Sequence, residues 1–385
     1  MPASYNPGMG SSFDVCIRGA GIVGRALALL LARERLRVAL VGEPAAARPR
    51  PDVRAYALNT ASQALLQSLR CWPEPAEATP VLGMEVFGDE GGAVRFDAAA
   101  QQAPALAWIV DVPALEARLA DAVRYQPQVE WVEAPVDAAL TVVCEGRAST
   151  TRDAMNVRYE VSAYHQQALA LRLRCEKPHG QVARQWMGQG GILAFLPLDG
   201  PSGNSVAGVW SVPEDEAPAL LALDPEALAR RLEESSQGAL GTLVLTSECA
   251  AWPLQLARAD HWVGRWPGQK PGQSGKGWAL AGDAAHTVHP LAGQGLNLGL
   301  ADAAGLTRVL REREYWRGLG DERLLRRYER SRKAALAAMA VATDGLQQLF
   351  ARDDAAARSL RNWGMKGFER SGPLKQWVAR QAMGL

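Results

Sequence analysis

A glycine-rich turn between an apolar segment and a helical segment constrains the fold of this chain more than any other feature. Residues 13–18 form a short apolar run, residues 19–24 read Gly-Ala-Gly-Ile-Val-Gly, and alanine and leucine then recur up to residue 33. A second apolar run follows at residues 37–41. A strand, a glycine turn, a helix and a strand in this order predict the first unit of a parallel sheet that binds a nucleotide.

Each glycine of this turn has an expected role. Gly19 allows the tight turn, Gly21 lets the backbone approach a pyrophosphate, and Gly24 lets the helix pack closely on the strand. Such a site also expects an acidic residue about 20 positions further on, which holds the ribose hydroxyls. Gly42 occupies that place and Glu43 follows it. Glu43 therefore reaches the ribose only if the end of the strand bulges.

A second segment, residues 278–302, also predicts a ligand site. An apolar strand from Trp278 to Ala281 leads into Gly282-Asp283, a loop, and a helix expected to begin near Gly295. The start of a helix leaves N–H groups unpaired and carries partial positive charge, which suits a phosphate or an electron-rich ring edge. The Asp283 carboxylate would accept hydrogen bonds from ribityl or ribose hydroxyls. No metal site is predicted, because two histidines at 286 and 289 are too few ligands for zinc.

These motifs carry a family resemblance. Gly-Asp-Ala-Ala-His at 282–286, followed by His-Pro-Leu-Ala-Gly-Gln-Gly-Leu-Asn-Leu-Gly at 289–299, resembles the second FAD-binding segment of the flavoprotein aromatic hydroxylases. Arg-Gln-Trp at 184–186, Leu-Ala-Phe-Leu-Pro-Leu at 193–198 and Val-Trp-Ser at 209–211 are similar to the ubiquinone-biosynthesis hydroxylases within that group. The resemblance extends from residue 13 to residue 384.

The resemblance implies an α/β fold. A Rossmann-type FAD-binding domain, built from a parallel sheet with helices, would be interleaved with a mixed-sheet substrate domain and followed by C-terminal helices. We predict a disordered leader at 1–12, an FAD-binding domain formed by 13–155 plus 266–311, a substrate-binding domain at 156–265 and a helical region at 312–385. Within the substrate domain, Val157 to Ala163 and Ala168 to Cys175 are predicted as two strands.

The implied activity is that of an FAD-dependent monooxygenase. The reduced flavin would react with O2 to give a flavin hydroperoxide, which hydroxylates an apolar aromatic substrate, a polyprenylated phenol of ubiquinone biosynthesis. NAD(P)H or a separate reductase would supply the electrons. No catalytic side chain is predicted, because the flavin carries the chemistry. The cofactor-binding residues implied are Gly19, Ala20, Gly21, Val23, Gly24, Glu43, Arg54, Gly282, Asp283, Pro290, Gly293, Gln294, Gly295, Leu296 and Asn297.

Three aromatic residues of the substrate domain, Trp186, Phe195 and Trp210, are candidates for the substrate pocket. Packing in the domain core is the commoner role for such large apolar side chains. Arg18, at the end of the first strand, has three open roles: pairing with a phosphate, pairing with a carboxylate, or pointing away from the strand.

Two alternatives to the hydroxylase remain. Family members have Asp-Gly where this chain has Glu145-Gly146, and a small meander is missing near residues 133–139. Together with Gly42, these departures favour a non-catalytic subunit of a ubiquinone-biosynthesis complex, whereas the intact 282–299 segment favours an enzyme. The other alternative is a flavin-dependent isoprenoid reductase, which shares the fold but not the match at 184–212.

Composition restricts partners and location. The net charge of +1 gives no indication of a nucleic-acid surface. The five cysteines are scattered without a Cys-x-x-Cys pair, as expected for reduced thiols in the cytoplasm. No apolar run reaches the roughly 18 residues that cross a membrane. Residues 373–384 predict a basic amphipathic helix, for which packing on the protein is favoured over peripheral contact with a membrane.

Overall fold

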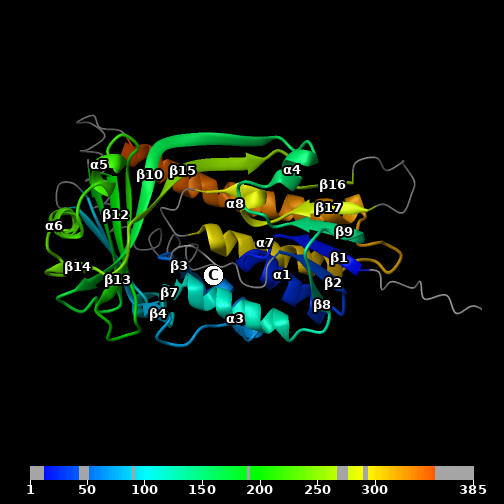
Figure 1. Ribbon diagram of the computed structural model, residues 1–385, viewed down its shortest axis with the longest axis horizontal. Coiled ribbons are helices and arrows are strands. Elements are labelled where there is room, and N and C mark those ends of the chain that lie inside the picture. Colours follow the sequence, from blue (N-terminus) through cyan, green and yellow to red (C-terminus); the bar gives the residue numbers. More distant parts are fainter. Residues whose placement is uncertain are drawn as a thin grey trace, which may run out of the picture.

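The computed structural model describes residues 13–42, 52–88, 92–188, 191–266, 276–288 and 294–351, with side chains up to residue 337. The predicted leader at 1–12 and the basic segment at 373–384 lie outside these ranges. Two large sheets occupy opposite ends of the molecule, and the long strands β10 (Tyr159–Cys175) and β15 (Ala250–Ala259) run between them (Figure 1).

The first sheet confirms the predicted nucleotide-binding architecture. Its strands β8, β2, β1, β9 and β17 lie side by side and all run parallel, with β16 antiparallel at one edge. In chain order this arrangement is 3-2-1-4-5, the order of a doubly wound sheet. The strands are β1 (Phe13–Arg18), β2 (Val38–Val41), β8 (Val129–Val132), β9 (Ala138–Val143), β16 (Val263–Arg265) and β17 (Gly277–Leu280).

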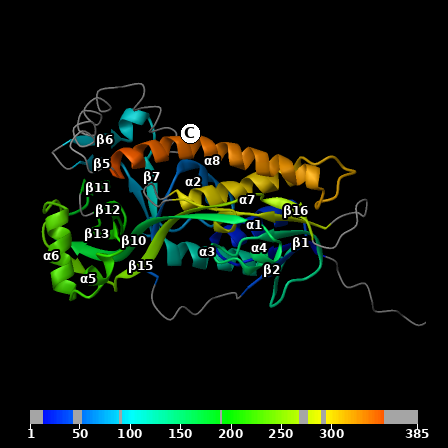
Figure 2. The same ribbon diagram turned by 90° about the horizontal axis from the view of Figure 1, so that it is seen from above.

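Four helices pack beside this sheet. Helix α1 (Ile22–Arg33) contacts both α3 (Val112–Arg124) and α7 (Gly295–Arg311). Helix α8 (Glu322–Ala351) lies along α7 and reaches β16 and β17, as Figure 2 shows. The apolar positions of α3 recur at helical spacing and are buried, so this helix is structural.

The second sheet is mixed and largely antiparallel. Its strand order is β18-β15-β10-β13-β12-β11-β5-β6, and β14 also pairs with β10. Its core is apolar and includes the alternating leucines of β10. The strands other than β10 and β15 are β5 (Gly83–Phe87), β6 (Ala93–Asp97), β11 (Val182–Gly188), β12 (Gly191–Pro197), β13 (Ser205–Pro213), β14 (Leu243–Leu245) and β18 (His286–Thr287).

The prediction of two separate strands at 157–163 and 168–175 is wrong. The chain forms one strand, β10, whose pairing with β15 shifts register between Ala163 and Gln167. His165 has a φ of 54° within this irregularity. A β-bulge interrupts the alternation of side chains without ending the strand, so the sequence pattern breaks where the strand does not.

The remaining elements are short. A small third sheet has the order β3-β7-β4. In sequence, β3 and β4 come between β2 and β5, and β7 comes between β6 and β8. No helix in the described part of the chain is long and apolar enough to cross a membrane. These elements are β3 (Ala55–Leu58), β4 (Ala78–Val81), β7 (Ala107–Asp111), α2 (Thr60–Ser68), α4 (Thr150–Ala154), α5 (Ala217–Leu221), α6 (Pro225–Ser235), and the 3-10 turns η1 (Ala99–Gln101) and η2 (Gly282–Ala284).

The sheets exchange strands more finely than the predicted residue ranges. Strands β5 and β6, from the first range, pair in the second sheet, and β16, from the substrate range, pairs in the first. Strand β18 follows the Gly282-Asp283 turn directly and joins the second sheet through β15. The second glycine-rich segment therefore passes from one sheet to the other. The predicted domain boundaries stay a prediction.

Candidate functional site

The predicted nucleotide site lies where the first sheet reverses its winding. Strands β1 and β9 are adjacent and parallel, so their carboxyl ends share one edge. Gly19 has a φ of 109°, and a Cβ there would lie 2.4 Å from the carbonyl oxygen of Cys144 at the end of β9. Open α/β sheets bind ligands in the crevice at such a switch point.

Two helices begin at this edge, and both present uncapped N-termini. Within the described ranges, no N-cap side chain bonds the first turn of α1, at Gly21, or of α7, at Gln294. A Cβ built on Gly21 or on Gly295 would meet no described atom within 4 Å. Unpaired N–H groups at a helix start that no described atom covers suit a phosphate or an electron-rich ring edge. These cradles fit a dinucleotide cofactor.

The fold brings the two glycine-rich segments together through Val23. A Cβ on Gly299 would lie 2.6 Å from the side chain of Val23, and a Cβ on Gly282 would lie 3.4 Å from it. Val23 therefore occupies space that a side chain at position 299 would need, and it lies at ordinary contact distance from position 282. The N-terminal turns of α1 and α7 thus form one site from residues far apart in the sequence.

Asp283 is exposed, whereas the other residues from 281 to 286 are buried. Desolvation by the surrounding protein raises the pKa of its carboxyl, and His286, Arg147 and Arg54 oppose that rise. Arg54 also contacts Asp52, at 2.7 Å, and its guanidinium lies 5.9 Å from the centre of the Tyr56 ring. An accessible carboxylate that feels the charge of two arginines can orient a hydroxylated ligand by hydrogen bonds.

Arg152 and Tyr159 hold the backbone that presents Asp283. The Tyr159 hydroxyl donates to the carbonyl of Asp283 at 2.9 Å and lies 3.0 Å from the hydroxyl of Thr287. The Arg152 guanidinium is 3.6 Å from the centre of the Tyr159 ring and donates to the carbonyl of Ala284. Sequence reasoning missed this role of Tyr159, since nothing in the sequence pairs residue 159 with residue 283.

A buried carboxylate, Asp302, supports the same segment through hydrogen bonds. It is fully buried on α7 and accepts hydrogen bonds from the Gly282 amide at 3.0 Å, His286 Nε2 at 2.7 Å and Arg332 Nε at 2.7 Å. Burial would raise the pKa of Asp302, but His286 and Arg332 outweigh it and hold that pKa below its usual range. Sequence reasoning missed Asp302, although an acid within the apolar run of α7 was a usable signal.

Glu145 resolves the open role of Arg18. Its carboxylate accepts hydrogen bonds from the hydroxyls of Ser149 at 2.7 Å and Thr151 at 2.6 Å and from Arg18 Nε at 3.1 Å. Burial alone would raise the pKa of Glu145, but these hydrogen bonds and the Arg18 charge lower it. The longer carboxylate thus ties the loop after β9 to the end of β1.

We expect Glu145→Gln to destabilise the protein by about 1–3 kcal/mol, because a partly buried carboxylate loses charge-assisted hydrogen bonds. Urea unfolding at neutral pH measures this loss. Because the pKa of Glu145 is lowered on folding, its contribution is present above the usual carboxyl pKa and is lost as the pH falls through the folded value. An unchanged unfolding midpoint at neutral pH would show that the interaction with Arg18 contributes nothing.

Asn297 joins α7 to residues 57–59, at the end of β3. Its side-chain oxygen accepts from the Asn59 amide at 3.0 Å, and its side-chain nitrogen donates to the carbonyl of Ala57 at 2.9 Å. Asn59 in turn caps α2 by accepting a hydrogen bond from the amide of Ser62. The polar atoms of the Asn297 side chain are therefore engaged with protein, and a cofactor contact at this residue stays a prediction.

Gly42 has a structural reason for its departure from the expected acidic residue. Its φ is 142°, and a Cβ there would lie 2.8 Å from the Cβ of Ala20. A side chain at this position would collide with the glycine turn. Glu43, Pro290 and Gly293 lie outside the described residues. The other predicted cofactor residues lie within the described ranges, and their contact with a cofactor stays a prediction: Gly19, Ala20, Gly21, Val23, Gly24, Arg54, Gly282, Asp283, Gln294, Gly295, Leu296 and Asn297.

Comparison with known proteins agrees with this geometry. Residues 120–343, more than half of the chain, match the family described as FAD binding domain. The chain belongs to this FAD-binding family. It is 30% identical to the 3-demethoxyubiquinol 3-hydroxylase of Escherichia coli over 97% of this chain and 98% of the relative. It is 31% identical to the ubiquinone hydroxylase UbiL of Rhodospirillum rubrum over 100% of this chain and 93% of the relative.

A solved structure confirms the fold of this FAD-binding family member. The p-nitrophenol 4-monooxygenase of Pseudomonas putida superposes with a TM-score of 0.73 at 16% identity, covering 97% of this chain and 98% of that chain.

The three aromatic side chains predicted near the substrate lie in the core of the second sheet. Trp186, Phe195 and Trp210 are 6%, 1% and 5% exposed. Trp186 stacks on Phe87 with ring centres 5.6 Å apart and packs edge-on against Phe195 at 5.1 Å. These contacts account for the aromatic residues by packing, and a substrate contact stays a prediction. Among the described residues, no group of three potential metal ligands occurs.

Proposed function

We propose that this protein is an FAD-dependent monooxygenase that hydroxylates the aromatic ring of a polyprenylated phenol in ubiquinone biosynthesis. The observation that carries the proposal is the meeting of two uncapped helix starts at the switch point of the first sheet, beside the accessible Asp283. Near full-length similarity to the two ubiquinone-pathway hydroxylases supports this substrate class.

The residues present would hold FAD in two parts. The N–H groups at the start of α1, around Gly21, would bind the pyrophosphate. Asp283 would accept hydrogen bonds from the ribityl–phosphate part, and the start of α7 at Gly295 would face the ring edge. Reduced FAD supplies the reaction with O2 that delivers one oxygen atom to an electron-rich ring, with reducing equivalents derived from NAD(P)H directly or through a separate reductase.

The protein's own contribution is to hold and order this edge. Asp302 fixes the Gly282 amide and His286, while Arg152 and Tyr159 fix the carbonyls of Ala284 and Asp283. Backbone N–H groups that are rigidly placed stabilise negative charge that develops on a bound ligand. Because a polyprenylated substrate resides in a lipid bilayer, we also propose a cytoplasmic enzyme that contacts the membrane and other enzymes of the pathway.

The test is the visible spectrum of the purified protein before and after addition of FAD. We expect flavin absorption with about one FAD per chain, and O2-dependent hydroxylation of a short-chain prenylated phenol when NAD(P)H and a reductase are supplied. A protein that stays colourless in excess FAD would favour the non-catalytic subunit instead. Flavin reduction followed by saturation of a prenyl double bond without O2 uptake would favour the isoprenoid reductase.

A further inference from the structure

Two adjacent aromatic side chains are exposed in the turn between α7 and α8. Tyr315 is 94% exposed and Trp316 is 67% exposed. Their rings pack against each other edge-on, with centres 4.8 Å apart and planes at 86°. Among the described residues, neither ring is buried in a core cluster. Large aromatic side chains that pack on each other at the surface indicate a contact surface.

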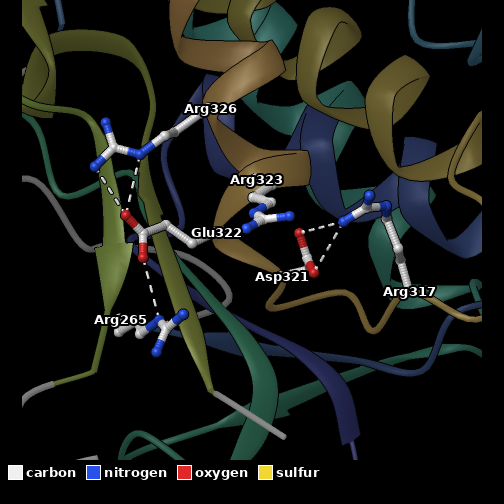
Figure 3. Close-up of a pocket in the computed structure, with 6 residues that line it drawn as sticks. All are labelled: Arg265, Arg317, Asp321, Glu322, Arg323 and Arg326. Carbon is white, nitrogen blue, oxygen red and sulfur yellow. Dashed lines mark hydrogen bonds and ion pairs between the residues drawn. The ribbon is translucent and has the colours of Figure 1, made fainter. Parts of the chain in front are cut away.

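An arginine-rich pocket adjoins this pair along the chain. Arg317 follows Trp316 directly and lines a cavity of about 430 Å³ at the start of α8 (Figure 3). The cavity thus begins one residue after the aromatic pair. The residues that line it are Arg265, Arg317, Asp321, Glu322, Arg323 and Arg326.

Positive charge exceeds negative charge in this pocket. Asp321 accepts two hydrogen bonds from Arg317, at 3.1 and 3.2 Å. Glu322 binds Arg326 at 2.8 Å and Arg265 at 3.1 Å. Arg323 is exposed and has no hydrogen-bond or ion-pair partner among the described residues, and Figure 3 shows its guanidinium between the two paired groups. Among the lining residues, two carboxylates therefore face four guanidinium groups. Glu314, outside the lining, adds a third carboxylate 2.9 Å from Arg317, and the start of α8 adds partial positive charge.

The wider turn, residues 311–333, also carries an excess of positive charge. Residues 311–333 contain nine arginine or lysine residues and five aspartate or glutamate residues, whereas the whole chain has a net charge of only +1. The basic character is therefore local. It lies at the end of α7 remote from Gly295, about 25 Å along a helix of 17 residues.

We propose that Tyr315, Trp316 and the arginine pocket form a docking surface for an anionic lipid bilayer. The two amphipathic rings would lie at the level of the headgroups, where tyrosine and tryptophan are enriched. Arg323 would face lipid phosphates, since basic side chains are attracted to anionic headgroups. Two rings on one turn are few for a specific protein interface of about 800 Å² per partner, so the observations favour a bilayer.

The test is flotation of the full-length, FAD-loaded protein with vesicles of phosphatidylcholine alone or of phosphatidylcholine with phosphatidylglycerol. We expect binding to the anionic vesicles and not to the neutral ones. The Tyr315→Ser/Trp316→Ser double variant should bind the anionic vesicles at least about tenfold more weakly than the parent protein. Arg323→Gln should bind about fivefold more weakly, as expected for the loss of one basic side chain at an anionic surface.

The matched control is Tyr125→Ser, which removes an aromatic side chain that is 77% exposed at the end of α3. It should bind as the parent protein does. All variants should keep the flavin content and thermal midpoint of the parent, because the altered side chains are exposed, so a failure of flavin binding is recognised separately. Equal binding by the double variant and its parent, or no binding of the parent to anionic vesicles, would overturn the proposal. In the second case, the surface would be left to a protein partner.

Discussion

Replacement of Gly24 by alanine is expected to disrupt the packing of α1 on β1. A Cβ at this position would lie 1.9 Å from the carbonyl oxygen of Gly19 and 3.1 Å from its carbonyl carbon. Both obstacles are backbone atoms of the turn, so no side-chain rotation relieves the collision. Helix α1 would have to move away from β1, and we expect a loss of about 3 kcal/mol or more in the free energy of unfolding. Urea unfolding and the yield of soluble protein measure this.

Gly21→Ala makes the same chemical change three residues earlier and serves as the control. Gly21 has a φ of −76°, which alanine adopts freely, and a Cβ there meets no described atom within 4 Å. Its unfolding free energy should stay within about 0.5 kcal/mol of the parent. Its affinity for FAD should fall about tenfold or more, because the methyl group enters the proposed pyrophosphate space. If Gly21→Ala bound FAD normally, the proposed cofactor position would be wrong.

Asp302→Asn is expected to cause the second large loss of stability. The substitution keeps the shape of the side chain but removes the charge that faces Arg332 and His286. Breaking a buried ion pair leaves uncompensated charge, so we expect a loss of about 3–5 kcal/mol in the free energy of unfolding. The Gly282 amide would also lose its charged acceptor, and FAD affinity should fall together with stability. Equilibrium urea unfolding and FAD titration measure the two effects.

The control for Asp302→Asn is Glu234→Gln, which breaks the pair between Arg231 and Glu234. The two side chains of that pair are 56% and 68% exposed, so its loss should change the unfolding free energy by less than about 1 kcal/mol. Similar losses in the two variants would show that burial of the Asp302 cluster adds nothing.

The effect of Asp302→Asn should also depend on pH in a defined direction. The folded pKa of Asp302 lies below its usual value, so its contribution is fully present above the usual carboxyl pKa of about 3.9. That contribution is lost as the pH falls through the folded pKa. The difference between parent and variant should therefore be large at neutral pH and shrink in strong acid. A difference that grew on acidification would contradict the assigned charge state.

Local sequence patterns were sufficient to predict the first unit of the parallel sheet, whereas the rest of the fold was expected from the family resemblance. The glycine turn after the first apolar run predicted β1, α1 and β2, because turn geometry and helix periodicity are set by near neighbours in the chain. The start of α7 at Gly295 was predicted for the same reason. The β10 strand was predicted as two, since its bulge depends on pairing with β15.

Only the tertiary structure decided how the site is supported. Asp302 and Arg332 are 30 residues apart, and Tyr159 and Asp283 are 124 apart, so no local pattern joins them. The sequence by itself predicted that two glycine-rich segments would face a nucleotide cofactor. Packing of α1 against α7 placed Val23 between Gly282 and Gly299 and made those segments one site. Such contacts form between surfaces that exist only after the chain has folded, which is why sequence spacing did not reveal them.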